Sequence, residues 1–223
     1  MQNDYLIIGN CFIYEIIEKE LHKSKVILNM EISKNLKIYN DITVLEASKA
    51  KFENYKWIFY DKNGNNINIE NFRIAVTGDF DIKPVKYQNE KYEDSDEKTI
   101  RKLDENISEK DKTLYSSRLK KIIFDFDYDG IAEKLCTTSN FLFGEKNKKN
   151  YMYLEKNGTI VDKITDFDAN LFHIIEVLKI NGSIYIIVLK SLGDPISYKD
   201  KNLFIYRILN NKIVECKIDL LHY

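Results

Sequence analysis

Short runs of β-branched and aromatic residues, separated by Asn, Asp and Gly, recur along most of this chain. Between residues 25 and 77 four such runs follow one another, and the stretch DKNGN separates the last two. Apolar runs divided by turn-forming residues are typical of strands joined by hairpins. We therefore expect a hairpin meander here, and its runs are KVILNMEI, LKIYNDITVLE, KWIFY and NINIENFRIAV.

The last hundred or so residues carry a pattern that recurs after about fifty positions. The stretch IIFDFDYDG, from Ile122, corresponds to IIEVLKING, from Ile174, and NYMYLEKNGTIVDKI resembles NLFIYRILNNKIVECKI. The DG and NG dipeptides predict two-residue hairpin turns with positive φ. Units of four antiparallel strands are typical of propeller blades or of β-meander arrays. The predicted strands are 118–124, 131–142, 150–155 and 159–164 in the first unit, and 171–179, 183–190, 202–208 and 212–218 in the second.

The pattern as a whole predicts a mainly β protein, an antiparallel meander of four-stranded units arranged like propeller blades or as a sandwich. Residues 90–112 differ, because most are charged and the few apolar ones recur at helical spacing. We expect one short charged helix or a linker there. The predicted organisation is an N-terminal β region at 1–88, the charged helix or linker at 89–116, and two four-stranded β repeats at 117–223.

The composition excludes several classes of function. Lys and Arg number 34 against 35 Asp and Glu, so no overall field favours nucleic acid or an anionic membrane. Three widely spaced cysteines argue against a zinc knot or a dense disulfide framework, and we expect them to be free. The N-terminal apolar run has no basic residues before it and ends at acidic Glu15, unlike a signal peptide, and no segment reaches membrane-spanning length.

The stretch IIFDFDYDGIAE is the most specific chemical signal in the sequence. Ca²⁺ takes six to eight oxygen ligands, and a loop with acids at alternate positions followed by Gly can wrap around it. Without a cation, three carboxylates in five residues repel one another, so a bound ion would stabilise the loop by neutralising their charges. A helix-loop-helix site would need Glu where this chain has Cys136. The loop positions that match calcium ligation are Asp125, Asp127, Asp129, Gly130, Ile131 and Glu133.

At these residues the sequence resembles the calcium loop of FG-GAP and VCBS-type β-repeat proteins, whose DxDxDG turn joins neighbouring strands of a propeller blade. The resemblance implies a structural calcium ion and an extracytoplasmic setting, periplasmic or at the cell envelope, with a cytoplasmic one as the alternative. Two departures are Tyr128, where Gly or Asn is usual, and the sister turn at Gly182, which lacks the acids. The implied ligands are the side chains of Asp125, Asp127, Asp129 and Glu133 and the carbonyl of Ile131.

Two alternatives stay open beside this reading. The same stretch resembles motif I of the haloacid dehalogenase-like phosphohydrolases, which implies Asp125 as nucleophile and Asp127 as acid/base beside Mg²⁺. That family needs a doubly wound sheet with helices, whereas hairpins are predicted here. The other alternative is a metal-free turn in a β inhibitor or immunity-type protein. The sequence favours a non-enzymatic binding module, for an unidentified protein or surface ligand, with one hairpin stabilised by calcium.

Overall fold

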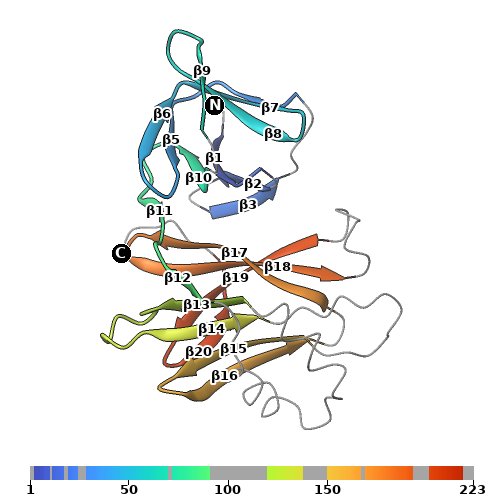
Figure 1. Ribbon diagram of the computed structural model, residues 1–223. Coiled ribbons are helices and arrows are strands. Elements are labelled where there is room, and N and C mark those ends of the chain that lie inside the picture. The colour runs from blue at the N-terminus through green and yellow to red at the C-terminus, as the bar shows by residue number, and fades with distance from the viewer. Residues whose placement is uncertain are drawn as a thin grey trace. The chain divides into compact units, whose positions relative to one another are not determined.

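The structure is a computed structural model that describes residues 3–10, 12–17, 20–24, 29–69, 72–90, 120–137, 150–166, 169–192 and 201–217 (Figure 1). These residues contain no helix, and their strands form four antiparallel sheets, which confirms the predicted mainly β class. The predicted charged helix or linker, from residue 91 onward, lies outside the described residues.

The strands of the first half, in chain order, are β1 (Asp4–Ile8), β2 (Phe12–Ile17), β3 (Glu20–Ser24), β4 (Glu31–Ile32), β5 (Leu36–Tyr39), β6 (Val44–Ala47), β7 (Lys49–Glu53), β8 (Lys56–Tyr60), β9 (Asn66–Ile67), β10 (Ile74–Thr77), β11 (Ile82–Pro84) and β12 (Gln88–Glu90). Those of the second half are β13 (Lys120–Phe124), β14 (Glu133–Thr137), β15 (Asn150–Lys156), β16 (Thr159–Asp166), β17 (Ala169–Ile180), β18 (Ser183–Leu192), β19 (Lys201–Leu209) and β20 (Lys212–Glu215).

Two compact units share these strands, and the first contains Met1–Lys86 with the hairpin tip Leu178–Ser183. Its two sheets have the strand orders β3-β2-β1-β10-β5-β6 and β4-β7-β8-β9. Alternate residues of both sheets are buried against each other, as expected for strands with one face on a core. The principal core side chains are Ile7, Ile13, Leu36, Ile38 and Ala75 from the first sheet and Ile32, Ala50, Phe52, Trp57 and Phe59 from the second.

The first unit departs from a simple meander. β10 crosses over to pair with β1 on one side and β5 on the other. All four residues of β10, Ile74–Thr77, are buried, and a strand without an exposed face belongs in the middle of a sheet. The chain passes from one sheet to the other at Ser48, whose hydroxyl donates to the carbonyl of Asp61 at 2.7 Å. The expected meander was therefore wrong in its connectivity, although its hairpins β5-β6 and β7-β8 are present.

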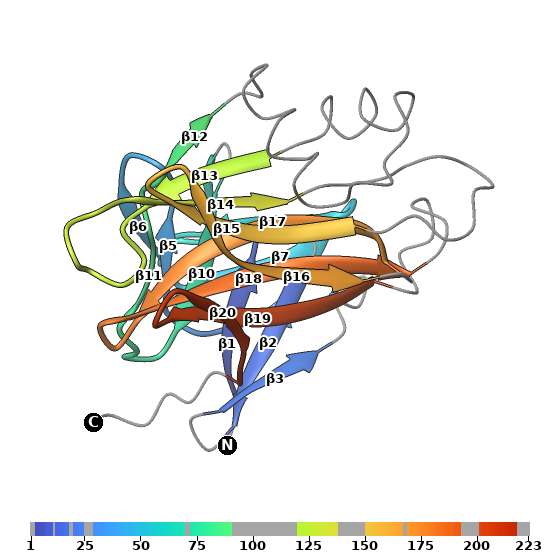
Figure 2. The same cartoon turned by 90° about the horizontal axis from the view of Figure 1, so that it is seen from below.

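The second unit contains Tyr87–Val177 and Ile184–Cys216. Two meanders, β13-β14-β15-β16 and β17-β18-β19-β20, account for its strands, with β12 added to the edge of the first meander (Figure 2). All eight strands of the meanders have a counterpart in the structure, but β14 covers only Glu133–Thr137 of the predicted 131–142, and residues 138–142 lie outside the described residues. The edge strands β16 and β20 adjoin, and Asp162 Oδ2 accepts the N–H of Ile213 at 2.7 Å. The described residues form no closed ring of blades, and the relation of the meanders as repeats stays a prediction.

Turn chemistry explains why these hairpins form. Positive φ at both turn residues gives the type I′ geometry that matches strand twist. The predicted turn at Asn181-Gly182 has this geometry. The predicted turn at Asp129-Gly130 does not, since positive φ falls at Tyr128 and Gly130 and the connection spans residues 125–132. Among the described residues, the two-residue turns with positive φ at both positions are Asn54-Tyr55, Asn157-Gly158, Asn181-Gly182 and Asn210-Asn211.

Phe59→Ala tests the core of the first unit. Phe59 is 2% exposed and packs edge-to-face on Phe72, so its truncation should lower the free energy of unfolding by roughly 3–5 kcal/mol. Trp57, the only tryptophan of the chain, lies in the same core, so its fluorescence during urea unfolding reports this unit. Ile42→Ala is the control: Ile42 is 87% exposed, and its change should stay within about 0.5 kcal/mol. Equal losses in the two variants would contradict the assigned core.

Candidate metal centre

The acidic loop, residues 125–132, joins β13 to β14 and begins where the apolar run of β13 ends. Phe124 pairs with Glu133 in the register of the two strands, so the acid at the start of β14 stands directly across from the end of β13. Phe126 is buried and packs edge-to-face on Phe124, which draws the first turn of the loop inward. Phe126 is thus buried while Tyr128 is 53% exposed, and the acids that alternate with them lie close to each other.

Asp125 shapes the loop through the backbone. Its Oδ1 accepts the N–H of Asp129 at 3.1 Å, and its Oδ2 accepts the N–H of Gly130 at 2.9 Å. Gly130 has φ +87°, a conformation that costs glycine little and other residues more. Asp129 in turn accepts the N–H of Ile131 at 2.9 Å. In this longer connection, side-chain carboxylates therefore accept hydrogen bonds from backbone N–H groups that a two-residue hairpin would pair with the neighbouring strand.

Glu133 is the buried member of the group. Its side chain is 0% exposed, and its Oε2 accepts the N–H of Phe126 at 2.8 Å. Burial of a carboxylate is costly unless hydrogen bonds and an opposite charge compensate it. The backbone donor meets part of this requirement, and a cation must meet the rest.

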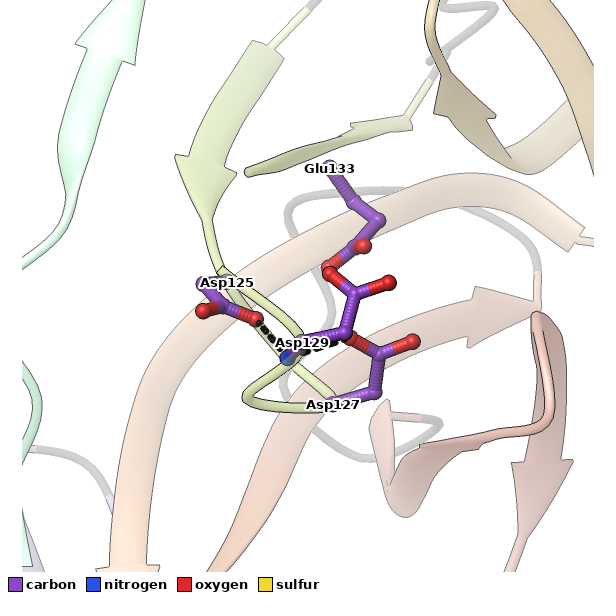
Figure 3. A group of neighbouring side chains, drawn as sticks. All are labelled: Asp125, Asp127, Asp129 and Glu133. Carbon is purple, nitrogen blue, oxygen red and sulfur yellow. Dashed lines mark hydrogen bonds between the residues drawn. The ribbon is translucent and has the colours of Figure 1, made fainter. Parts of the chain in front are cut away.

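The four acids converge. One carboxylate oxygen from each of Asp125, Asp127, Asp129 and Glu133 lies within 4.8 Å of the others, a spacing that could hold a metal ion. Figure 3 shows Asp127, Asp129 and Glu133 close together, with Asp125 reaching the backbone nitrogen of Asp129 from the other side of the loop. The exposed fraction falls from 43% for Asp129 to 22% for Asp127 and 0% for Glu133. The cluster is thus open to solvent on one side and enclosed on the other.

A lysine from another hairpin lies among these carboxylates. Lys156, the last residue of β15, places its Nζ 2.6 Å from Asp129 Oδ2, 2.6 Å from Glu133 Oε1 and 3.1 Å from Asp127 Oδ2. The register of β14 and β15 ends at the pair of Lys134 and Glu155, and one further step brings Lys156 to Glu133. The lysine side chain is 11% exposed. One positive charge, that of Lys156, therefore already lies beside the four acidic side chains.

These contacts shift two pKa values in opposite directions. The ammonium of Lys156, hydrogen-bonded to Asp129, lowers the pKa of that carboxyl below 3.8, and the N–H of Ile131 adds to the effect. The same hydrogen bond, followed by the one to Glu133, raises the pKa of Lys156 above 10.5. Both shifts favour the charged forms, so at neutral pH the pair is ionised.

The structure brings together the four acidic side chains that the sequence selects as ligands. Ile131 lies in the same loop with its N–H bonded to Asp129, and the role of its carbonyl as a ligand stays a prediction. Lys156 was not selected, because its proximity depends on the register of β14 with β15. The sequence signal that could have found it is the position of a lysine at the end of β15, the strand that pairs with β14.

A second turn also begins with an aspartate, and it shows how a single carboxylate shapes a loop. Asp61 follows β8, and its Oδ1 accepts the N–H groups of Asn63 and Asn65, each at 2.8 Å. Its Oδ2 accepts the side-chain amide of Asn65 at 3.0 Å, and these bonds lower the pKa of the carboxyl. The neighbours that complete this turn are amides rather than carboxylates. Asp61 therefore illustrates loop shaping by one acid, to which the Asp125 loop adds three more.

No family model matches this chain, and no curated protein and no solved structure matches it. The likeness to FG-GAP and VCBS-type repeats therefore rests on the loop residues and on the all-β character of the fold. Within the part of the chain that the structure describes, there is no helix with the length and apolar character of a membrane span.

Glu133→Ala tests the buried carboxylate. The substitution removes the oxygen that accepts the Phe126 N–H. Because this N–H is buried, its loss of a partner should lower the free energy of unfolding by roughly 1–3 kcal/mol. Glu133→Gln keeps an acceptor oxygen and should lose less. Calorimetric unfolding in the presence of a chelator measures both variants. Equal stability of Glu133→Ala and the wild type would contradict the assigned hydrogen bond.

Acid should weaken the loop through Asp129. Its folded pKa lies below its unfolded value of 3.8, so its ion pair stabilises the fold above that value and loses its effect as pH falls through the folded pKa. The Tm of the wild type should therefore drop more steeply between about pH 5 and pH 2 than the Tm of Asp129→Asn, which has no carboxyl to protonate. Parallel Tm profiles of the two proteins would contradict a role of the Asp129 carboxyl in the acid response.

Proposed function

We propose that the loop from Asp125 to Glu133 binds one calcium ion, which stabilises the β13–β14 hairpin of a non-enzymatic binding module. The observation that carries the proposal is the convergence of four carboxylate oxygens within 4.8 Å. The spacing of the acids in the DxDxDG pattern, and the likeness of that pattern to FG-GAP and VCBS-type loops, support the same reading.

The donor set favours calcium over other divalent ions. All four side chains offer hard carboxylate oxygens, and no described histidine or cysteine belongs to the group. Hard cations prefer such oxygens, whereas zinc in structural sites prefers sulfur and nitrogen. Calcium accepts six to eight ligands in flexible geometry, so the carbonyl of Ile131 and water can complete the shell.

The charge of the loop supports a divalent partner. One ammonium, that of Lys156, pairs with three of the four acidic side chains. A net negative charge therefore remains, and like charges this close repel one another. A divalent cation removes more of that repulsion than a single ammonium does. A site with three or four acids suits the millimolar calcium found outside the cytosol, which supports an extracytoplasmic setting for the protein.

The phosphohydrolase alternative fits the fold poorly. The strand that ends in the two aspartates continues into an antiparallel hairpin, and the described sheets are antiparallel without helices. Both oxygens of Asp125, the residue expected to attack phosphorus, accept backbone N–H groups of its own loop. This arrangement supports a loop-shaping role for Asp125 and a binding role for the protein.

A metal-free interaction module is a second candidate, and Lys156 is the observation that favours it. Its three ion pairs supply a cation to the cluster without any metal. In that case the loop is a fixed acidic surface feature, and the protein acts by surface complementarity, as an inhibitor or immunity-type protein does.

Calcium titration separates these candidates. The protein, freed of divalent ions with a chelator, should show a rise in Tm with millimolar CaCl₂ and a smaller rise with MgCl₂, because magnesium demands stricter octahedral geometry. Asp125→Asn should weaken the calcium response. Asp79→Asn is the matched control: it belongs to another Asp-Phe-Asp triplet, and its side chain is fully exposed in the first unit.

The outcomes differ clearly. A calcium response that Asp125→Asn reduces and Asp79→Asn retains supports the proposed site. A Tm unchanged by calcium favours the metal-free module. Turnover of a generic phosphate ester that requires Mg²⁺ and disappears in Asp125→Asn would instead establish the phosphohydrolase.

A further inference from the structure

We propose that Lys156 is the built-in counter-ion of the acidic loop, and that a divalent cation binds only by displacing its ammonium group. This inference rests on the proposed calcium site and adds a regulator to it. Lys156 would then set the affinity of the loop and connect its state to the β15–β16 hairpin.

The ammonium and a metal ion compete for the same atoms. Lys156 Nζ lies 2.6 Å from Asp129 Oδ2 and 2.6 Å from Glu133 Oε1, two carboxylates of the cluster. Calcium binds carboxylate oxygens at about 2.3–2.6 Å, so an ion held by these oxygens would stand where the ammonium stands. Two cations so close repel one another strongly. Either cation therefore excludes the other.

The buried carboxylate explains why one of the two must always be present. Glu133 is fully buried, and one of its oxygens is already committed to the Phe126 N–H. The other oxygen faces Lys156. An unpaired charge in this position would be costly, so the loop has a lysine-closed state and a metal-loaded state and avoids the state with neither cation.

The lysine can leave without unfolding the sheet. Its backbone belongs to β15, whereas its ammonium sits on a flexible four-carbon chain that can swing toward water. Lys156 directly precedes the turn residues Asn157-Gly158. Withdrawal of the ammonium removes the ion pairs that tie this turn to the acidic loop, so calcium binding in one hairpin releases the tip of the next.

Lys156→Met tests the inference, because it keeps the length of the aliphatic chain and removes the charge. Isothermal titration of the chelator-treated full chain with CaCl₂ should show at least a tenfold lower Kd for the variant, since calcium no longer has to displace an ammonium. Lys134→Met is the matched control. Lys134 directly follows Glu133, but its ammonium pairs with Glu90 at 3.7 Å and forms no ion pair with the four acids, so its loss should leave the Kd unchanged.

A second measurement needs no variant. The rate at which an amine-reactive acetylating reagent modifies Lys156 in the wild type, followed by mass spectrometry, should rise severalfold in saturating CaCl₂. The rate at Lys134 should not change. This readout follows the ammonium itself and stays informative if Lys156→Met fails to fold.

The outcomes distinguish this inference from the proposed function. Tighter calcium binding by Lys156→Met, or binding by that variant alone, supports the lysine as counter-ion. Equal or weaker binding by the variant, with calcium still bound by the wild type and Lys156 acetylation unchanged, overturns the inference and leaves the calcium site standing. Absence of calcium binding in both proteins overturns the proposed function and this inference with it.

Discussion

The burial of Glu133 at the start of β14 is the constraint on which the acidic loop depends. A carboxylate with no exposed surface needs a hydrogen bond or an opposite charge at both oxygens, and here a backbone N–H bonds to Oε2 while the ammonium of Lys156 forms an ion pair with Oε1. Once Lys156 is drawn to Glu133, its remaining donors reach Asp127 and Asp129 as well. One enclosed charge thus brings Lys156 to the two more exposed carboxylates of Asp127 and Asp129, and the loop gains a cation that its own sequence lacks.

The same constraint gives the loop its chemical interest. A site whose acids were all exposed would gain little from any cation, because water screens exposed charges well. Here the cluster is enclosed at Glu133 and open at Asp129, so a cation is held firmly on one side and remains accessible on the other. This asymmetry suits the exchange of an ammonium for a metal ion that we propose, and it supports the proposed calcium response of the β13–β14 hairpin.

Comparison of turns within the chain separates loop shaping from charge clustering. Asn181-Gly182 closes β17 and β18 with two residues of positive φ and no acid. Asp61 closes a longer turn with one carboxylate and neighbouring amides. The Asp125 loop uses its first acid in the same way and adds three more, each of which also accepts one backbone N–H of the loop. Those bonds do not require the four carboxylates to converge within 4.8 Å, and this convergence is what the proposed cation binding would explain.

The sequence by itself determined the β class, the eight strands of the two meanders and the four acids of the candidate site. These features follow from local rules: alternation of apolar residues, positive φ at Asn-Gly, and acids at alternate positions of one loop. Tertiary structure alone decided the crossover of β10, the length of the connection at residues 125–132, and the arrival of Lys156 among the carboxylates. The physical reason is that register and burial depend on partners distant in the chain, so no local pattern places Lys156 beside Glu133.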